Sequence, residues 1–329
     1  AEEWADKTAD DVLAALQEAG LSPLDHFEQF GQDEGLEAKP VTDIEVPGTP
    51  GQIFTLTTNT DKVVASDYEL AEGETEEDVV RTSANDDTIE AIASGLTSER
   101  TLNPADVIDG GEGNDTLAVS QSGNFTGFNS DGSLTNVETV EIINTSDLSR
   151  SFNAAEIEGV ETFSVEANDQ DYTVSNLGAA GLTVVATGMD DDTLTLGFTT
   201  AAVEGDADAM ALETTDLGSE DDDVSVVAAG VEELSVASNG EANYLDLSGA
   251  DAVESLSVTG DADLSVSAVA DTVTGIDGSE AAGDLTLDLS GATVESVTTG
   301  AGDDTVTVDD ITVDSSLNGG AGADTLAAD

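Results

Sequence analysis

A short phrase, Val-Glu, returns from residue 137 onward at nearly regular intervals. Five of the seven Val-Glu pairs fit this recurrence, and they begin at Val137, Val160, Val231, Val253 and Val294. The intervals are 23, 71, 22 and 41 residues, close to one, three, one and two multiples of 20 to 24 residues. A fixed period in this range is typical of a solenoid, in which each coil buries its aliphatic face against the next. The phrase therefore predicts stacked coils and favours them over a β-sandwich, which does not explain the recurring phase.

The hydrophobic pattern of residues 52–329 is that of short strands. Alternating runs such as 53–56, 137–142 and 285–289 are separated by Gly, Asp, Asn and Ser. No proline follows Pro104, which suits strands that pair on both sides. The aromatic fraction is only 4%, so the core is expected to consist of small aliphatic layers. We predict an all-β fold over 52–329, a parallel β-helix or β-solenoid.

The first 51 residues follow a different pattern. Residues 1–36 carry apolar residues at helical spacing, and Ser22-Pro23 is placed to begin the second of two helices. Residues 37–51 contain three prolines, which indicates a linker. We expect a small N-terminal helical module over 1–36, followed by this linker. The single histidine, His26, is interpreted as a surface or packing residue because no second histidine or cysteine accompanies it.

The charge of the chain is extreme. Seventy-two Asp and Glu oppose six Lys and Arg, which gives a formal net charge of −66. Repulsion of this size opposes compaction unless bound cations or a saline habitat screen it. Strong acidity is also typical of disordered chains, but a hydrophobic fraction of 38% and the ordered alternation of Val and Leu favour a folded protein. No basic residue follows Arg150, so we expect no nucleic-acid partner, whose phosphates need Lys and Arg.

The sequence has no cysteine, and no apolar run is long enough for a transmembrane segment. Outside the cell, a chain without disulfides needs another source of stability, and bound metal is the obvious one. The chain begins at Ala1 without a basic and apolar leader. It ends within a repeat, which is compatible with a piece of a longer protein.

Three nine-residue segments fit the calcium-binding pattern G-G-x-G-x-D-x-U-x, in which U is aliphatic. Residues 110–118 and 319–327 fit at every constrained position, and residues 299–307 differ only by Thr299 at the first. Glycines allow positive φ and inward carbonyls, and the aspartate adds a carboxylate. Calcium prefers roughly six to eight oxygen ligands, so such turns favour Ca²⁺. The predicted metal-site residues are Gly111, Gly113, Asp115, Gly300, Gly302, Asp304, Gly320, Gly322 and Asp324.

Three weaker copies keep the aspartate and the following aliphatic residue but lose glycines. They are residues 188–194, 218–224 and 85–89. We interpret each as a solvated acidic turn rather than a metal site. The copy around Asp115 is expected to stand alone, and Asp304 and Asp324 are 20 residues apart, which does not match a tandem array of nine-residue repeats. A regular roll of nonapeptides is therefore not expected.

These nonapeptides, together with residues 107–111 and 136–140, resemble the RTX-type calcium-binding surface-layer (S-layer) proteins of Gram-negative bacteria. Residues 22–31 resemble a short helical module at the head of such proteins. The resemblance implies type I secretion without a cleaved N-terminal signal, calcium-driven folding outside the cell and assembly into a lattice. It also implies that the helical module contacts cell-surface polysaccharide. The acidic C-terminal secretion segment expected of the family is not evident before Asp329.

We therefore expect a secreted, extracellular structural protein that self-assembles with Ca²⁺ at the cell surface, with copies of itself as partners. The alternative is a calcium-dependent matrix filament or adhesin, although threonine does not form an unbroken two-column array in the sequence. An enzyme is not expected, because the motifs of metalloproteases and serine hydrolases are missing and no lyase-type base follows Arg150. A polysaccharide-active enzyme that uses two carboxylates is the less favoured alternative.

Overall fold

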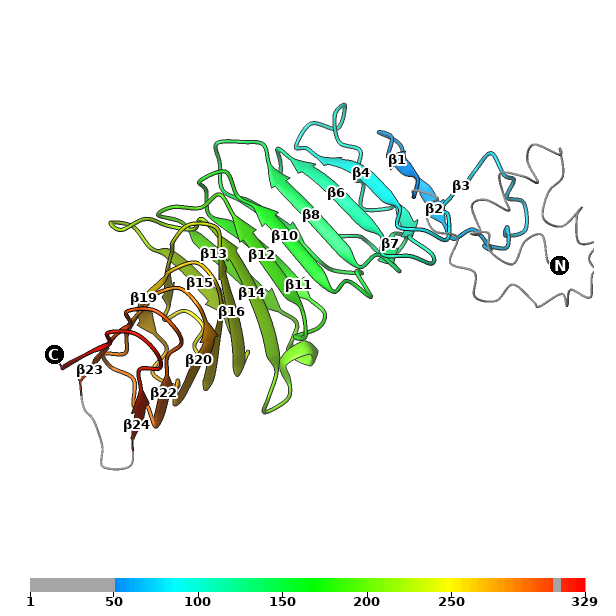
Figure 1. Ribbon diagram of the computed structural model, residues 1–329. Helices are drawn as coiled ribbons and strands as arrows, with labels where there is room; N and C mark the ends of the chain where they lie inside the picture. Colours follow the sequence, from blue (N-terminus) through cyan, green and yellow to red (C-terminus); the bar gives the residue numbers. More distant parts are fainter. Residues whose placement is uncertain (1–50, 310–314, 329) are drawn as a thin grey trace, which may run out of the picture. The chain divides into compact units, whose positions relative to one another are not determined.

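The computed structural model describes residues 51–309 and 315–328, in which every paired strand runs parallel to its neighbours (Figure 1). Strands pair from one coil to the next: Thr88 aligns with Thr116, and Thr116 aligns with Thr139. The predicted all-β parallel solenoid is confirmed. The only helical element of the described residues is one 3₁₀ turn, Thr200–Val203. The predicted helical module over 1–36 and all but the last residue of the predicted linker lie outside the described residues.

The coils contribute to three sheets. The largest sheet contains, in spatial order, β1 (Ile53–Thr55), β4 (Thr88–Ala93), β6 (Thr116–Gln121), β8 (Thr139–Asn144), β10 (Thr162–Glu166), β12 (Thr183–Thr187), β14 (Ala209–Thr215), β16 (Glu233–Asn239), β18 (Ser255–Gly260), β20 (Gly275–Ala281), β22 (Ser296–Thr298) and β24 (Ser316–Asn318). The second contains β9 (Arg150–Asn153), β11 (Tyr172–Leu177), β13 (Thr193–Phe198), β15 (Val224–Ala228), β17 (Asn243–Leu247), β19 (Leu264–Val269), β21 (Leu285–Asp288), β23 (Thr305–Val308) and β25 (Thr325–Ala328). The third contains β3 (Val80–Arg81), β2 (Lys62–Val64), β5 (Val107–Asp109) and β7 (Ser133–Thr135).

The Val-Glu phrase marks the corner that leads into the largest sheet. Val137 and Val231 are fully buried there. The following glutamates bond from coil to coil through their backbones, since the Glu161 N–H donates to the Glu138 carbonyl at 2.8 Å. The five copies precede β8, β10, β16, β18 and β22. These strands are one, three, one and two coils apart in the sheet order, so the predicted coil counts are confirmed.

The position of the Val-Glu phrase relative to the aligned strands shifts once, by two residues, between β10 and β16. Glu161 aligns through Leu182 and Met210 with Leu234, which lies two residues after Glu232. Since side chains of a strand alternate between faces with a period of two, a two-residue shift leaves the same face inward. The spacing of the Val-Glu phrase therefore stays close to whole numbers of coils, although the number of residues per coil varies.

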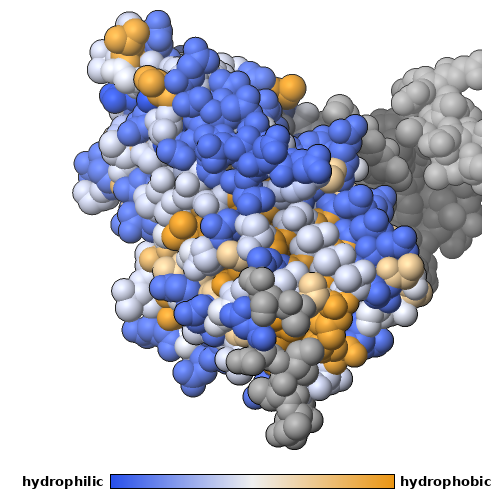
Figure 2. Space-filling model, turned by 90° about the vertical axis from the view of Figure 1, so that its left-hand side faces the viewer, coloured by the Kyte–Doolittle hydropathy of each residue, from blue (hydrophilic) through white to orange (hydrophobic). Residues whose placement is uncertain are grey.

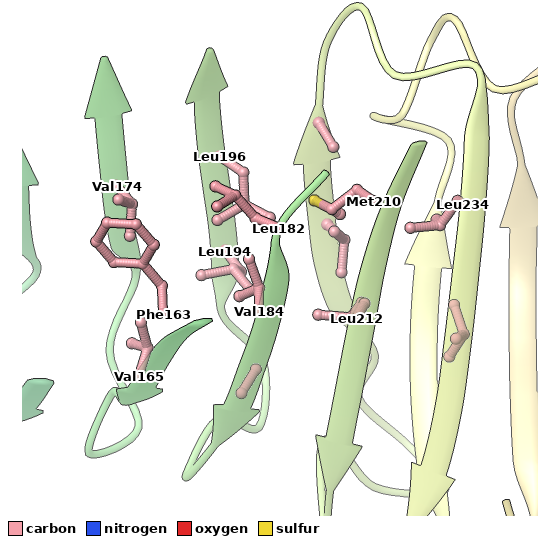
Figure 3. Close-up of a cluster of buried hydrophobic side chains, with 14 of the residues drawn as sticks. Phe163, Val165, Val174, Leu182, Val184, Leu194, Leu196, Met210, Leu212 and Leu234 are labelled. Carbon is pink, nitrogen blue, oxygen red and sulfur yellow. The ribbon is translucent and has the colours of Figure 1, made fainter. Parts of the chain in front are cut away.

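Aliphatic side chains from the two larger sheets meet in the interior (Figure 3). Val184 of β12 lies between Phe163 of β10 and Leu212 of β14 in one inward column, and Figure 3 shows Leu194 and Leu196 of β13 across from it. The predicted aliphatic layers are thus present. The aromatic residues are more clustered than expected: Phe125, Phe128, Phe152 and Phe163 form consecutive ring contacts, with centroids 4.9 to 6.4 Å apart.

Two of the six basic residues hold a loop in the first coils of the solenoid. The chain makes a long excursion between β2 and β3, and two cations fasten it. The Lys62 ammonium contacts the Glu74 carboxylate and the Tyr68 hydroxyl. The Arg81 guanidinium pairs with Glu76 at 3.0 Å and donates to the Tyr68 carbonyl at 2.9 Å. These cations hold a loop rather than form a binding patch.

The surface fits the acidic composition. Figure 2 views the solenoid from the side that lies at the left of Figure 1. Hydrophilic residues cover most of that face, with one larger hydrophobic patch and several separate hydrophobic residues. In the described part of the chain, no helix is long and apolar enough to cross a membrane.

Candidate calcium-binding corners

The three nonapeptides occupy two different corners of the solenoid. Residues 110–118 connect β5 to β6, whereas 299–307 and 319–327 lead from the largest sheet into β23 and β25. The two C-terminal copies lie on consecutive coils, directly stacked, with Thr305 aligned with Thr325. The spacing of 20 residues is one coil, so these copies repeat by coil and not by nonapeptide, in agreement with the expectation that no regular roll forms.

The copy around Asp115 does have a stacked neighbour, contrary to the sequence analysis. The weak copy at 85–89 lies on the preceding coil, with Thr88 aligned with Thr116. Asp87 is 1% exposed and its carboxylate accepts hydrogen bonds from the Ser83 N–H and hydroxyl. The interpretation of this segment as a solvated acidic turn is therefore wrong for Asp87, because the coil contacts remove it from water.

The aspartates of the nonapeptides join each coil to the one before it. The Asp115 Oδ1 accepts the Asp87 N–H at 2.7 Å across 28 residues. In the same way the Asp304 Oδ1 accepts the Leu285 N–H at 2.8 Å, and the Asp324 Oδ1 accepts the Asp304 N–H at 3.2 Å. In each case the donor is the residue at the same register on the preceding coil. One carboxylate oxygen thus satisfies a backbone group that would otherwise be left without a partner.

The second oxygen of two of these carboxylates is buried without a partner. Asp115 and Asp304 are 0% and 1% exposed, and the Oδ2 of each accepts no hydrogen bond from the described residues. The hydroxyl of Thr299, which replaces the first glycine of its nonapeptide, is likewise buried and without a partner. Buried polar atoms are normally paired, so these three oxygens need a proton, a water or a cation.

A cradle of oxygens surrounds the first glycine of the complete copies. A Cβ at Gly110 would lie 2.5 Å from the Asp115 Oδ2 and closer still to the Asn136 carbonyl oxygen. At Gly319 a Cβ would lie 2.7 Å from the carboxyl carbon of Asp324. A side chain at these positions would occupy the space beside the carboxylate. Carboxylate and carbonyl oxygens are the ligands that calcium prefers, so the donor set fits this ion.

The predicted glycines serve two purposes. Five of the six have positive φ, from 71° to 144°, and meet the expectation of left-handed turns: Gly111, Gly113, Gly302, Gly320 and Gly322. Gly300 has no positive φ. Glycine is required there for lack of space, because a Cβ would lie 2.6 Å from the Gly278 carbonyl oxygen and closer to that of Ala281. Close stacking of coils therefore requires glycine as much as the turn does.

Sequence reasoning missed a second, more exposed row of aspartates beside the C-terminal copies. The Asp263 Oδ1 accepts the Asp284 N–H, the Asp284 Oδ1 accepts the Asp303 N–H, and the Asp303 Oδ1 accepts the Ala323 N–H, each at 2.8 to 2.9 Å. This row runs in the opposite sense, because each donor lies on the following coil. Its only signal in the sequence is an aspartate spaced 21 and then 19 residues along the chain.

The two remaining weak copies are less buried than the copy around Asp87. Asp192 and Asp222 hold the position of Asp87 in the copies at 188–194 and 218–224. Asp222 is exposed, as the interpretation as a solvated turn predicts, whereas Asp192 is half-buried. Within 51–309 and 315–328, no group of three or more Asp, Glu or His side chains converges as a metal site.

A search with protein-family models finds no match for this chain, and a search of curated proteins finds no similar sequence.

Burial is the main cause that raises the pKa of Asp115 to about 6. The hydrogen bond from the Asp87 N–H opposes this rise, and the nearby carboxylates of Asp87, Glu138 and Asp86 contribute to it. Burial also raises the pKa of Asp106 to about 6. Both values lie above the ordinary 3.8, so the folded chain binds these two protons more tightly than the unfolded chain does.

The pH dependence of stability follows from this sign. In protein freed of divalent ions beforehand, the free energy of unfolding is expected to fall as pH rises from about 4 to about 6, since the buried carboxylates must then ionise. A shift of two pKa units corresponds to on the order of 3 kcal/mol per group. The side chain of Asp115→Asn cannot ionise, so this variant is expected to lose a clear part of this fall. Asp106, Asp192 and Asp222, whose pKa values are also raised, retain the rest. Urea unfolding between pH 4.5 and 7 measures this fall in the free energy of unfolding. If the slope of that free energy against pH is unchanged in Asp115→Asn, the raised pKa does not belong to Asp115.

Proposed function

We propose that this chain is a secreted, non-catalytic structural protein that folds with Ca²⁺ and self-associates into a bacterial cell-surface layer. The observation that carries the proposal is the pair of buried carboxylate oxygens, Asp115 Oδ2 and Asp304 Oδ2, left without partners at glycine-rich corners. An ionised carboxylate is costly to bury unless a cation compensates it. A divalent ion at these corners satisfies both the orphan oxygen and the charge.

The residues that would hold the ion differ between the corners. At the first corner, Asp115 and the carbonyls of its glycine turn supply oxygens. At the second, Asp304 is accompanied by the Thr299 hydroxyl, and Asp324 lies on the next coil. Bound Ca²⁺ supplies positive charge inside a chain of net charge −66, which lowers the repulsion that opposes stacking of the coils.

Self-association in this proposal joins acidic solenoid surfaces through Ca²⁺. Type I secretion, and contact with cell-surface polysaccharide through residues 1–36, belong to the same proposal and rest on the resemblance to RTX-type S-layer proteins. The alternative of an adhesin with a flat threonine array receives less support. One outward column does contain five successive threonines, from Thr88 to Thr183, but the next column mixes Glu, Ala, Ser and Val.

Calcium is expected to raise the unfolding midpoint of the protein. A single site at a hundredfold excess of Ca²⁺ over Kd adds about 2.7 kcal/mol. Asp115→Asn and Asp304→Asn should each lose about one site's share of this gain. Asp190→Asn removes the same charge from an exposed turn and is expected to keep the full gain. Urea unfolding with Ca²⁺ and with EGTA measures the difference, and equal gains in all three variants contradict the proposed sites.

Assembly is tested separately by light scattering. The size of the particles is expected to rise with Ca²⁺ and to fall again on addition of EGTA. Sodium chloride at about 1 M screens charge without bridging carboxylates and serves as the control. If salt alone produces the same assemblies, calcium bridging is wrong. If size stays constant throughout while Ca²⁺ still stabilises the fold, the corners bind calcium but the surface-layer function fails.

A further inference from the structure

The strands β4, β6 and β8 lie side by side in the largest sheet (Figure 1). A notch opens across the outer face of these strands. Its volume is about 310 Å³. Its floor residue Ala118 is the last residue of the nonapeptide 110–118, but the notch lies beyond the glycine turn and Asp115, on the outward face of the strands. The loop after β4 closes one end, where the Thr101 hydroxyl accepts the Ile92 N–H at 2.8 Å.

The register of three strands creates the notch. Glu90 aligns with Ala118, which aligns with Glu141, so a small residue lies between two glutamates in one outward column. In the next outward column Ser120 lies between Ile92 and Ile143 in the same way. Each wall is therefore one glutamate and one isoleucine, and the floor is Ala118 and Ser120.

The side chains that form the walls of the notch are accessible to solvent and make few polar contacts within the described residues. Ile92 and Ile143 are 41% and 36% exposed, which is unusual for isoleucine on an otherwise acidic surface. Glu90 accepts one hydrogen bond, from the Thr55 hydroxyl at 3.0 Å, and is otherwise exposed. Glu141 is exposed, and within the described residues its carboxylate has no hydrogen-bond or ion-pair partner.

We propose that this notch binds a lysine or arginine side chain from a basic segment of a partner protein. The strands β4 and β8 are two steps apart in the sheet, about 9.5 Å, so the two carboxylates can lean over a cation between them. A long alkyl stem fits over the small floor residues, against the isoleucines. A purely apolar occupant would bury both carboxylates without compensation, and an anion would be repelled.

The composition of the chain indicates that the basic segment belongs to a different protein. The sequence holds only six Lys and Arg, and Lys62 and Arg81 already pair with glutamates. A surface with one sign of charge selects a partner of the opposite sign and steers its approach. The notch adds one defined binding position to this general attraction, since a groove wide enough for an alkyl chain and two carboxylates coincide on one register of β4, β6 and β8.

The test uses n-butylguanidinium as the probe and methyl NMR of protein labelled at Ala and Ile methyls. Saturable shifts are expected for the methyls of Ala118, Ile92 and Ile143. The probes n-butanol, which lacks the charge, and guanidinium at equal concentration, which lacks the stem, are expected to bind at least tenfold more weakly. Ala118→Leu fills the notch without changing its charge and is expected to abolish the saturable shifts.

Charge variants complete the test. Glu90→Gln with Glu141→Gln is expected to weaken binding at least tenfold. Glu213→Gln is the matched control, because Glu213 faces outward in the same column beside Ala237 and lies outside the notch, and it should leave binding unchanged. Shifts spread over all acidic faces, or undiminished binding to Ala118→Leu, would overturn the proposal. A change in the protein's own association state in the notch variants alone would instead assign the notch to a second copy and overturn the basic partner.

Discussion

Gly260→Val is expected to destabilise the solenoid by about 3 kcal/mol or more. Gly260 ends β18 with φ of 105°, a conformation that a β-branched residue adopts only with strain. A Cβ there would lie 2.7 Å from the Ser238 backbone nitrogen and closer to the carbonyl oxygen of the same residue. Backbone atoms of the neighbouring coil cannot move aside as a flexible side chain can, so overpacking adds to the strain. Urea unfolding monitored by circular dichroism measures the loss.

The matched control for this variant is Gly95→Val. A Cβ at Gly95 meets nothing within 4 Å, and its φ is not in the left-handed region. The same change of side chain is expected to cost less than about 1 kcal/mol there. Equal costs at both glycines would mean that the approach of coils at Ser238 is looser than described.

Phe152→Ala is the second large change. Phe152 is fully buried, and its ring lies 4.9 Å from that of Phe125 and 6.4 Å from that of Phe163. Truncation removes apolar contacts on three coils and leaves a cavity, which typically costs about 3–5 kcal/mol. Because each coil rests on its neighbours, the loss should lower the unfolding midpoint of the adjacent coils as well.

Phe198→Ala provides the comparison for this truncation, since Phe198 is only half-buried at the end of β13. Its cost is expected to be less than half that of Phe152→Ala. Hydrogen exchange of β9 and β11 distinguishes the local from the global effect. If the two variants lose equal stability, the aromatic cluster contributes no more than ordinary surface packing.

The sequence was sufficient for the fold class and for the count of coils between Val-Glu copies. Both rest on the period-two alternation and on buried valines, which are local signals. The assignment of strands to three sheets was not predictable, because the step between aligned residues in the two larger sheets ranges from 35 residues between Thr55 and Glu90 to 19 between Thr286 and Thr305. No local pattern records which wall of the coil a three-residue strand joins.

The candidate corners were predicted in part. The glycine positions and the three aspartates follow from the nonapeptide pattern, but the partner of each aspartate does not. Asp87 was misinterpreted because exposure depends on the coil that stacks on it, and the 28-residue step to Asp115 is invisible in a nine-residue motif. The notch was missed for the same reason: Glu90, Ala118 and Glu141 become neighbours only through register.

The vertical alignment of coils has a consequence for size variation. Leu234 aligns with Leu256, and Leu256 aligns with Ile276, so each rung presents nearly the same inward face to the rung beside it. Removal or duplication of one whole rung, for example residues 234–255, would therefore rejoin compatible surfaces and change only the reach of the molecule. A polypeptide built in this way is a spacer whose span can be set in discrete increments without redesigning its interior.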